Sequence, residues 1–163
     1  PPQIVPGVPG YRIQRTSSVI CGNLTLLLTL ERHNLIMIQP YITIAPSPGM
    51  GRGVFTSEDI EKGTIIEVSP VIVLSRAERE LTDRTILHDY IFEWDASRDQ
   101  ACMAMGYVPV YNHSYASNCE YEMDFEEGTI TVRAVRDIRK GEELFINYNG
   151  DWDDRKPVWF DAR

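Results

Sequence analysis

The feature that most limits the possible folds of this chain is a succession of short segments in which apolar and polar residues alternate. The segments that we expect to be strands are residues 41–45, 54–56, 64–68, 90–94, 120–125 and 129–135. Alternation of this kind is typical of strands with one buried face. Turn-forming pairs such as Lys62-Gly63 and Lys140-Gly141 separate the segments, and turns spaced by roughly ten residues are typical of all-β domains. The sequence therefore predicts a mainly β domain with little helix.

Local signals refine this prediction. Ser75 is followed three residues later by Glu78, a capping box that predicts one short helix beginning there. Glu126-Glu127-Gly128 lies between two alternating segments and predicts a hairpin. Pro70 is expected to confine its strand to a sheet edge or a bulge, because proline has no N–H to donate. Residues 46–53, which contain three glycines, are expected to form a loop.

Length and charge narrow the classes of function. The chain has 163 residues, which is enough for one domain with its own core but too few for two. Lysine and arginine number 16 against 24 aspartate and glutamate residues, a formal net charge of −8. This acidic balance argues against direct binding of nucleic acid, which needs basic side chains to displace counterions. It favours a basic protein partner, whose encounter with the chain it would speed.

The cysteine pattern and the hydropathy indicate a cellular compartment. Cys21, Cys102 and Cys119 are widely spaced and form no C-x-x-C pair, so we expect neither a disulfide framework nor a metal site. The longest apolar run, residues 24–30, is far shorter than the ~20 residues of a membrane-spanning helix. We therefore expect reduced thiols, no association with membranes and an intracellular location, cytoplasmic or, in a eukaryote, nuclear.

Two segments near the C-terminal end each combine a short apolar strand with a cluster of hydrogen-bonding groups. The first, residues 111–119, contains Asn112 and His113, and the second, residues 141–148, ends at Tyr148. The hairpin between them is expected to bring the Asn-His pair close to the tyrosine. Taken singly, Asn112 suits an Asx-type turn and Tyr148 a core tyrosine with one hydrogen bond. No nucleophile elbow accompanies His113, so hydrolase chemistry has little support.

Gly51-Arg52-Gly53 is a weaker signal. A dinucleotide-binding motif needs a third glycine and a following helix, and a phosphate-binding loop needs Gly-Lys-Ser/Thr, and neither is present. What remains is either an ordinary turn or a loop whose backbone approaches a ligand closely.

The ordered combination of these signals is more specific than any one of them. A glycine-rich loop near residue 51 comes first, Asn112-His113-Ser114 with Asn118 follows, and Gly141-Glu142-Glu143-Leu144 with Tyr148 comes last. In this order the motifs resemble the SET-domain family of S-adenosylmethionine-dependent protein lysine methyltransferases.

The resemblance covers residues 38–148 and extends toward Phe160. It implies a mainly β SET-domain fold, with several small twisted sheets around a C-terminal pseudoknot and one or two short helices. It also implies that residues 37–163 form the catalytic domain with a C-terminal aromatic tail. Residues 1–36 are then an N-terminal extension.

The resemblance further implies roles for single residues. Tyr148 matches the catalytic tyrosine, and Asn118 matches an asparagine that ties the two motif strands together. S-adenosylmethionine is the expected cofactor, and its expected binding residues are Gly51, Arg52, Gly53, Tyr111, Asn112, His113 and Trp159. For Trp159, plain core packing is the alternative.

The channel for the substrate lysine is expected to be apolar. Its expected wall residues are Tyr90, Phe92, Tyr107 and Ile146, which are equally suited to a core. No cysteine cluster follows Tyr148, so no zinc is expected to close the channel. Tyr115 and Ser117 stand where the family often has cysteine and proline, and neither change touches a group expected to bind the cofactor.

The function implied is methyl transfer from S-adenosylmethionine to the ε-amine of a lysine in a basic protein or peptide. One alternative is a non-catalytic SET-like module that recruits a basic protein partner. Another is a structural or regulatory domain that uses residues 1–36 to associate. The sequence leaves open the substrate lysine, the number of methyl groups added and the oligomeric state.

Overall fold

The computed structural model describes residues 36–95 and 97–158. The chain divides into two units, residues 1–31 and 32–163, and all described residues belong to the second. The boundary that we expect between an extension and the catalytic domain lies at residues 36/37 and stays a prediction. In the described residues no helix is long and apolar enough to cross a membrane.

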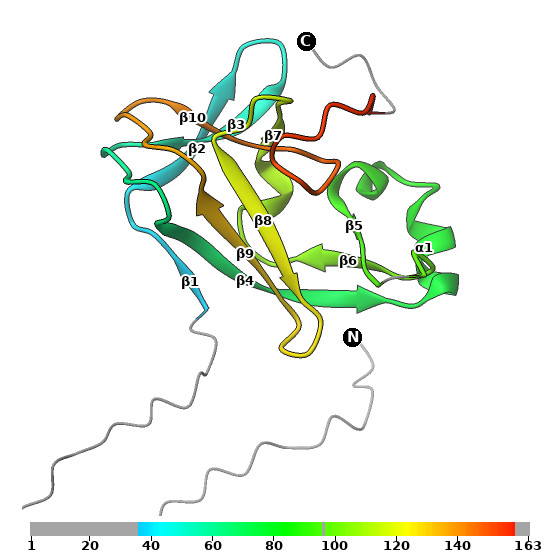
Figure 1. Cartoon of the computed structure of the whole chain (residues 1–163). Coiled ribbons are helices and arrows are strands. Elements are labelled where there is room, and N and C mark those ends of the chain that lie inside the picture. The colour runs from blue at the N-terminus through cyan, green and yellow to red at the C-terminus, as the bar shows by residue number, and fades with distance from the viewer. Residues whose placement is uncertain (1–35, 96, 159–163) are drawn as a thin grey trace, which may run out of the picture. The chain divides into compact units, whose positions relative to one another are not determined.

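The larger of two sheets has six strands, with the ten-residue strand β4 near its middle (Figure 1). Its strands follow the order β5-β6-β4-β9-β8, and β1 also pairs with β4. All pairs in this sheet are antiparallel. The bounds of its strands are Met37–Ile38 (β1), Ile65–Leu74 (β4), Phe92–Glu93 (β5), Ala101–Ala104 (β6), Cys119–Asp124 (β8) and Thr129–Ala134 (β9).

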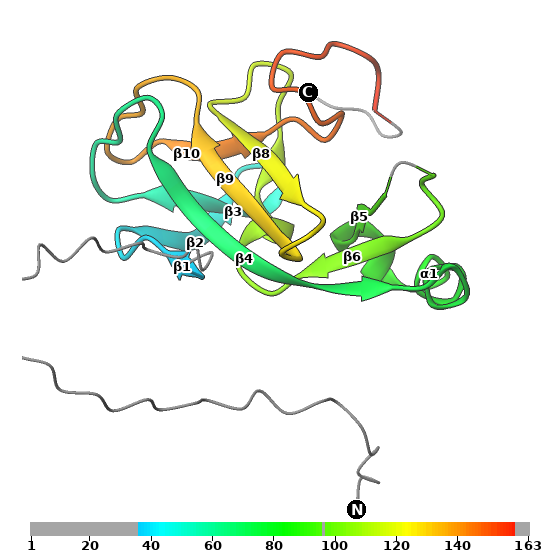
Figure 2. The same cartoon turned by 60° about the horizontal axis from the view of Figure 1, so that its bottom comes forward.

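The smaller sheet has four strands in the order β2-β3-β10-β7, and Figure 2 labels three of them, β2, β3 and β10. β2 and β3 form an antiparallel hairpin, and β10 adds to β3 in antiparallel orientation. β10 also pairs with β7, and this pair is parallel. The bounds of its strands are Ile42–Ser47 (β2), Gly51–Thr56 (β3), Asn112–His113 (β7) and Glu143–Ile146 (β10).

The helical elements are short. The predicted capping box is present at α1, Arg76–Thr82: the Ser75 side chain accepts from the Glu78 N–H, and the Glu78 carboxylate accepts from the Ser75 N–H. A 3-10 helix, η1 (Ile86–Tyr90), follows and is capped by the Thr85 side chain. A second 3-10 turn, η2 (Val108–Val110), lies just before β7. α1 lies beside the end of β4 (Figure 1).

One hydrophobic core contains side chains from both sheets. Val54 of β3 and Ile146 of β10 belong to the same cluster as Ile66 of β4 and Val132 of β9, and all four are fully buried. Burying such a side chain contributes roughly 1.5–3 kcal/mol, so the contact between the sheets is a main source of stability. The mainly β architecture confirms the predicted fold class.

The cysteines of the described residues are free and buried. Burial raises the pKa of the Cys102 thiol to about 12 and also raises that of Cys119. Both thiols therefore stay protonated at neutral pH and act as small apolar side chains. Cys21 lies outside the described residues.

Two predictions about proline and glycine were wrong. Residues 46–53 are largely strand, because β2 continues to Ser47 and β3 begins at Gly51. Pro46 is tolerated since β2 is an edge strand. Pro70 lies inside the central strand β4, at the point where β4 changes its partner from β9 to β6, so its missing N–H interrupts neither ladder.

The strand expected over residues 90–94 is also shorter than predicted. Only Phe92–Glu93 forms a strand, paired with β6, and Tyr90 ends η1. Thr85 accepts a hydrogen bond from the Leu87 N–H at 3.1 Å, which satisfies a donor at the start of the 3-10 turn. The hairpin at residues 126–128 is present as predicted, between β8 and β9.

Asn118 fastens the loop after β7 to β10, as expected. Its side-chain N–H donates to the Glu143 carbonyl at 2.8 Å, and its side-chain oxygen accepts from the Phe145 N–H at 2.8 Å. Ser117, in the same loop, donates to the carbonyl of Trp152. The loop is therefore bonded both to β10 and to the segment that follows it, with β10 lying between β3 and β7.

Candidate active site

The parallel pair β10–β7 brings together the two polar segments that the sequence singled out. Phe145 and Ile146 are in register with Asn112 and His113. Two residues beyond β10, the Tyr148 N–H donates to Nδ1 of His113 at 3.1 Å, and the two rings are 5.2 Å apart. The Asn-His pair and the terminal tyrosine therefore lie side by side, as predicted.

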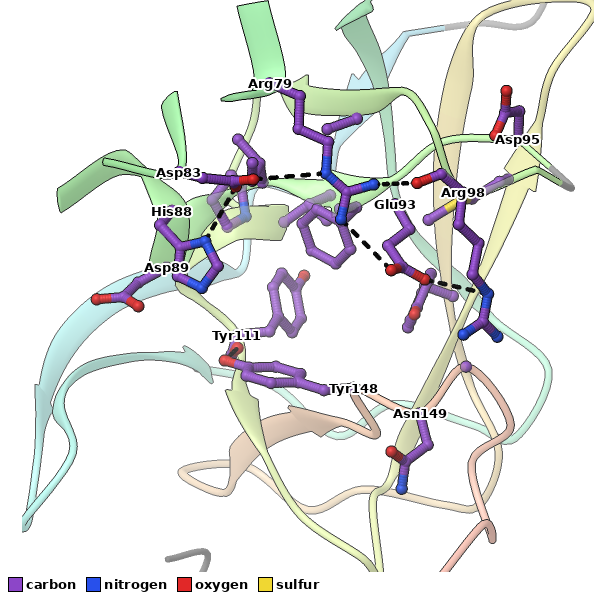
Figure 3. A pocket seen from close by; sticks show the side chains of 18 of the residues that line it. Arg79, Asp83, His88, Asp89, Glu93, Asp95, Arg98, Tyr111, Tyr148 and Asn149 are labelled. Atoms are coloured by element: carbon purple, nitrogen blue, oxygen red, sulfur yellow. Dashed lines mark hydrogen bonds and ion pairs between the residues drawn. The ribbon is translucent and has the colours of Figure 1, made fainter. Parts of the chain in front are cut away.

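The Tyr148 hydroxyl is held in a defined direction. It donates to the backbone carbonyl of Tyr111 at 2.8 Å, and Figure 3 shows the two tyrosines together at one side of a pocket. Burial, with smaller contributions from Asp89 and Tyr90, raises the pKa of Tyr148 to about 12. The phenol therefore keeps its proton at neutral pH, and its oxygen retains the acceptor capacity of a hydroxyl.

Asn112 is fixed by the glycine-rich hairpin and by β10. Its side-chain N–H groups donate to the Arg52 carbonyl at 3.0 Å and to a Glu143 oxygen at 2.6 Å. The second Glu143 oxygen accepts from the Ser47 hydroxyl at 2.8 Å. Since the two N–H groups are used within the protein, the side-chain carbonyl of Asn112 is the part suited to a ligand donor. Sequence reasoning gave Glu143 no role of its own, although its motif was noted.

Two cavities meet at Tyr148. The smaller, of about 270 Å³, is lined by residues of the β2–β3 hairpin and by Asn112. The larger, of about 840 Å³, is lined mainly by η1, β5, β8 and the segment after β10. Asp89, Pro109 and Tyr148 line both. No sequence signal pointed to Asp89 or Pro109, because their position depends on how η1 and η2 pack.

The smaller cavity suits a ligand that approaches the backbone closely. Gly51 has a φ of 76°, a left-handed conformation that favours glycine. At Gly53 a Cβ would lie 2.0 Å from a Glu143 oxygen and 2.9 Å from the Asn112 side-chain nitrogen, so only glycine fits between them. The exposed Arg52 side chain adds a positive charge to the wall of this cavity.

The larger cavity combines apolar walls with a charged rim, in which five acidic residues outnumber the bases Arg79, Arg98 and Lys156. Phe92 and Tyr121 pack edge to face with ring centroids 5.5 Å apart, and both line the cavity. Burial raises the pKa of Tyr121 to about 12, so this hydroxyl is neutral. The acidic residues lining the cavity are Asp83, Asp89, Glu93, Asp95 and Asp154.

Most of these acids are paired, as Figure 3 shows for the network around Arg79. Arg79 lies 3.8 Å from Asp83 and 3.5 Å from Glu93, and it also donates to the Arg98 carbonyl. His88 approaches Asp83 at 3.1 Å. Exposed pairs add little stability, but this network fixes the shape of the rim. Within the described part of the chain, Asp89 has no ion-pair partner.

The segment after β10 is held over the larger cavity by side-chain bonds. The buried Asn147 donates to the Asp154 carbonyl at 2.6 Å. The Tyr115 hydroxyl accepts from the Val158 N–H at 3.1 Å. Residues 149, 150, 154, 156 and 157 consequently contribute to the wall of this cavity.

The residues expected to line the lysine channel are divided by the structure. Phe92 lines the larger cavity and Tyr90 the smaller one. Tyr107 packs against the core and Ile146 is fully buried in it, and neither lines these two cavities. Trp159, the expected adenine contact, lies outside the described residues. Tyr111 lines the larger cavity and not the smaller one, and its role as a cofactor contact stays a prediction.

Comparison with known proteins gives a family for this geometry. A family model described as the SET domain matches residues 51–149. The chain is 32% identical over 126 residues to a Schizosaccharomyces pombe protein named histone-lysine N-methyltransferase, H3 lysine-37 specific; the match covers 77% of this chain and 80% of that one. The S. pombe histone-lysine N-methyltransferase set9 is 31% identical over 93 residues, which cover 55% of this chain and 18% of that one.

Solved structures show the same fold. A candidate histone methyltransferase of Plasmodium falciparum superposes with a TM-score of 0.54 and 31% identity, covering 71% of this chain and 98% of that one. The Chaetomium thermophilum Polycomb Repressive Complex 2, in a humanized mutant form, contains a chain with a TM-score of 0.56 and 23% identity, covering 66% of this chain and 14% of that one.

The family match includes Gly51, Arg52, Asn112 and Tyr148, which line the smaller cavity, and Tyr148 also lines the larger one. Both S. pombe relatives are named as histone-lysine N-methyltransferases, which favours the catalytic hypothesis over a binding module that only recruits a partner. The chain therefore belongs to the SET-domain family and is a protein-lysine methyltransferase.

Proposed function

We propose that the chain transfers a methyl group from S-adenosylmethionine to the ε-amine of a lysine in a basic protein segment. The observation that carries this proposal is that Tyr148 lines both cavities. A methyl donor in the smaller cavity and a lysine side chain in the larger one would meet at its hydroxyl. Alignment of two reactants in this way supplies much of the rate of a displacement reaction.

The residues of the smaller cavity fit S-adenosylmethionine, which when bound supplies an electrophilic methyl group on a sulfonium. The Asn112 side-chain oxygen would accept from the amino group of its methionine part. The exposed Arg52 guanidinium would pair with its carboxylate. Gly53 lets the hairpin pack closely against Glu143 and Asn112, and this packing would hold Asn112 in place for the ligand. His113, Tyr111 and Trp159 stay predictions as further cofactor contacts.

The larger cavity fits a lysine side chain. Its aromatic walls, Phe92 and Tyr121, would pack on the aliphatic stem and exclude water from the amine. A lysine is nucleophilic only when neutral, and desolvation lowers its pKa from the usual ~10.4. Asp89, which lines both cavities and contributes to the raised pKa of Tyr148, and the acidic net charge of the chain favour a basic segment around the target lysine. Tyr148 would accept a hydrogen bond from the neutral amine and orient it.

Binding of the cofactor is the first test. Calorimetric titration of S-adenosylmethionine into the purified chain should give saturable binding. The Asn112→Ala variant should bind at least about tenfold more weakly, because it loses a hydrogen bond to a charged group. A folded wild-type chain that takes up no heat of binding would contradict the proposed cofactor.

Turnover is the second test, and Tyr148→Phe is the matched variant because it removes only the hydroxyl. The assay uses labelled S-adenosylmethionine and histone H3, because H3 appears in the name of the S. pombe relative. The variant should lose about a hundredfold in kcat and keep its cofactor affinity. Mass spectrometry of the product would locate the lysine and count its methyl groups. Undiminished turnover in the variant would remove Tyr148 from the mechanism.

A further inference from the structure

A charged side chain that the proposed mechanism does not use lies at the centre of the larger sheet. Glu67 is on β4, in the run Ile65-Ile66-Glu67-Val68, and is 0% exposed. Carboxylates are almost never fully buried without partners, because removing a charge from water is costly. The position of this carboxylate therefore calls for an explanation.

All four recorded partners of Glu67 donate hydrogen bonds to it. Its Oε1 accepts from the Ser69 hydroxyl at 2.6 Å, from the Tyr107 N–H at 2.6 Å and from the Val108 N–H at 3.2 Å. Its Oε2 accepts from the Tyr111 hydroxyl at 3.1 Å. Burial raises the pKa of Glu67 despite these four bonds. Three of the four donors belong to one short segment, residues 107–111.

The neighbouring backbone is shaped to this carboxylate. A Cβ at Gly106 would lie 2.0 Å from Glu67 Oε1 and 2.0 Å from the Ser69 hydroxyl. No other residue fits there without displacing the carboxylate or the segment that follows. The close packing at Gly106 therefore holds residues 106–108 against the Glu67 carboxylate.

The segment that Glu67 holds is the one that orients Tyr148. Tyr111 is fixed to Glu67 through its hydroxyl. Its backbone carbonyl oxygen accepts a hydrogen bond from the Tyr148 hydroxyl, with 2.8 Å between the two oxygens. Tyr111 and Val108 are 1% and 0% exposed, and both line the larger cavity beside Tyr148. A chain of bonds thus runs from Glu67 through Tyr111 to the phenol at the junction of the two cavities.

We infer that Glu67 is a positioning residue for methyl transfer: by anchoring residues 107–111, it sets the direction of the Tyr148 hydroxyl. This inference rests on the proposed function. It gives Glu67 no contact with substrate or cofactor, and it predicts an effect on the chemical step rather than on cofactor binding. Asn112 and the glycine-rich hairpin, which border the smaller cavity, have no hydrogen bond to Glu67 among those described.

The test compares three variants of the whole chain by steady-state methyl transfer to histone H3 and by calorimetric binding of S-adenosylmethionine. Glu67→Ala should lower kcat by about a hundredfold, since small displacements of a positioned group cost this much, with cofactor Kd unchanged within about twofold. Glu67→Gln should recover kcat to within about fivefold of wild type, because its amide oxygen still accepts from the two N–H groups and its NH₂ can donate to the Tyr111 hydroxyl.

Ser69→Ala is the matched control, because it also removes a hydrogen bond to Glu67 but leaves residues 107–111 anchored. We expect its kcat to stay near that of wild type. Equal losses in Glu67→Ala and Ser69→Ala, or a loss in Glu67→Gln as large as in Glu67→Ala, would overturn the inference. So would an unchanged kcat in folded Glu67→Ala.

A fourth variant, Tyr111→Phe, covers the case in which Glu67→Ala does not fold. Tyr111→Phe breaks the link between Glu67 and Tyr111 while keeping the buried ring, and it should lower kcat with unchanged cofactor affinity. An unchanged kcat would overturn the inference. Failure of the proposed function gives a different result. A wild-type chain without cofactor binding or methyl transfer would refute both the proposed function and the role of Glu67. An active wild type with an equally active Tyr111→Phe would refute only the role of Glu67.

Discussion

The Tyr148 N–H fixes the tautomer of the neutral His113 ring. Its Nδ1 accepts from the Tyr148 N–H, so in the neutral ring the proton is on Nε2. Burial lowers its pKa below the ordinary value of 6.5. Protonation would place a hydrogen on Nδ1, facing the Tyr148 N–H, and would loosen the contact that fixes the backbone of Tyr148.

The pH dependence of stability follows from this depressed pKa. As pH falls below about 6.5, the unfolded chain binds a proton at this histidine before the native chain does, so the free energy of unfolding decreases. Urea denaturation between about pH 5 and pH 7.5 should show this decrease in wild type and a shallower one in His113→Gln. Equal slopes for wild type and His113→Gln would contradict the assignment.

The strand β10 depends on one side chain from a neighbouring loop. Asn118 is 2% exposed and bonds to β10 at both its N–H and its carbonyl oxygen. Replacing it with alanine removes the side-chain partner of two partly buried backbone groups, so Asn118→Ala should lower the free energy of unfolding by about 3 kcal/mol.

Loss of a helix-capping side chain is expected to destabilise the protein less than loss of Asn118. Ser75→Ala removes an exposed cap from α1 and should cost only about 1 kcal/mol. Thermal and denaturant unfolding of the two variants would measure the difference. If Asn118→Ala were no more destabilised than Ser75→Ala, β10 would be held by sheet pairing and core packing alone.

The charge of the whole molecule matters for its encounter with substrate. The net charge is −8, and Asp89, which lines the larger cavity, has no ion-pair partner among the described residues. Raising ionic strength from about 0.05 M to about 0.5 M shortens the range of attraction to a basic peptide. We expect kcat/KM for such a peptide to fall several-fold while kcat stays constant, and Asp89→Asn to weaken this dependence. Salt-independent kcat/KM would mean that shape rather than charge selects the substrate.

Part of the fold was predictable because it depends on local chemistry. The capping box at Ser75, the hairpin at residues 126–128 and the alternation of most strands need only neighbouring residues. Pro70 and Tyr90 were misplaced because their setting is not local. A proline is harmless where a long strand exchanges one partner for another, and an aromatic run becomes extended only where β6 pairs with it.

The sequence by itself determined the order of the motifs, and with it the family, the closeness of the Asn-His pair to Tyr148 and the acidic character of the molecule. Only the tertiary structure decided that Tyr148 lies where two cavities meet and that Asp89 and Pro109 border both. It also decided that Glu67, 44 residues away in sequence, bonds to the Tyr111 side chain. The physical reason is that caps, turns and the alternation of apolar and polar residues depend only on residues that are close in the chain. Cavities and buried charges arise only from the packing of segments that are distant in the chain.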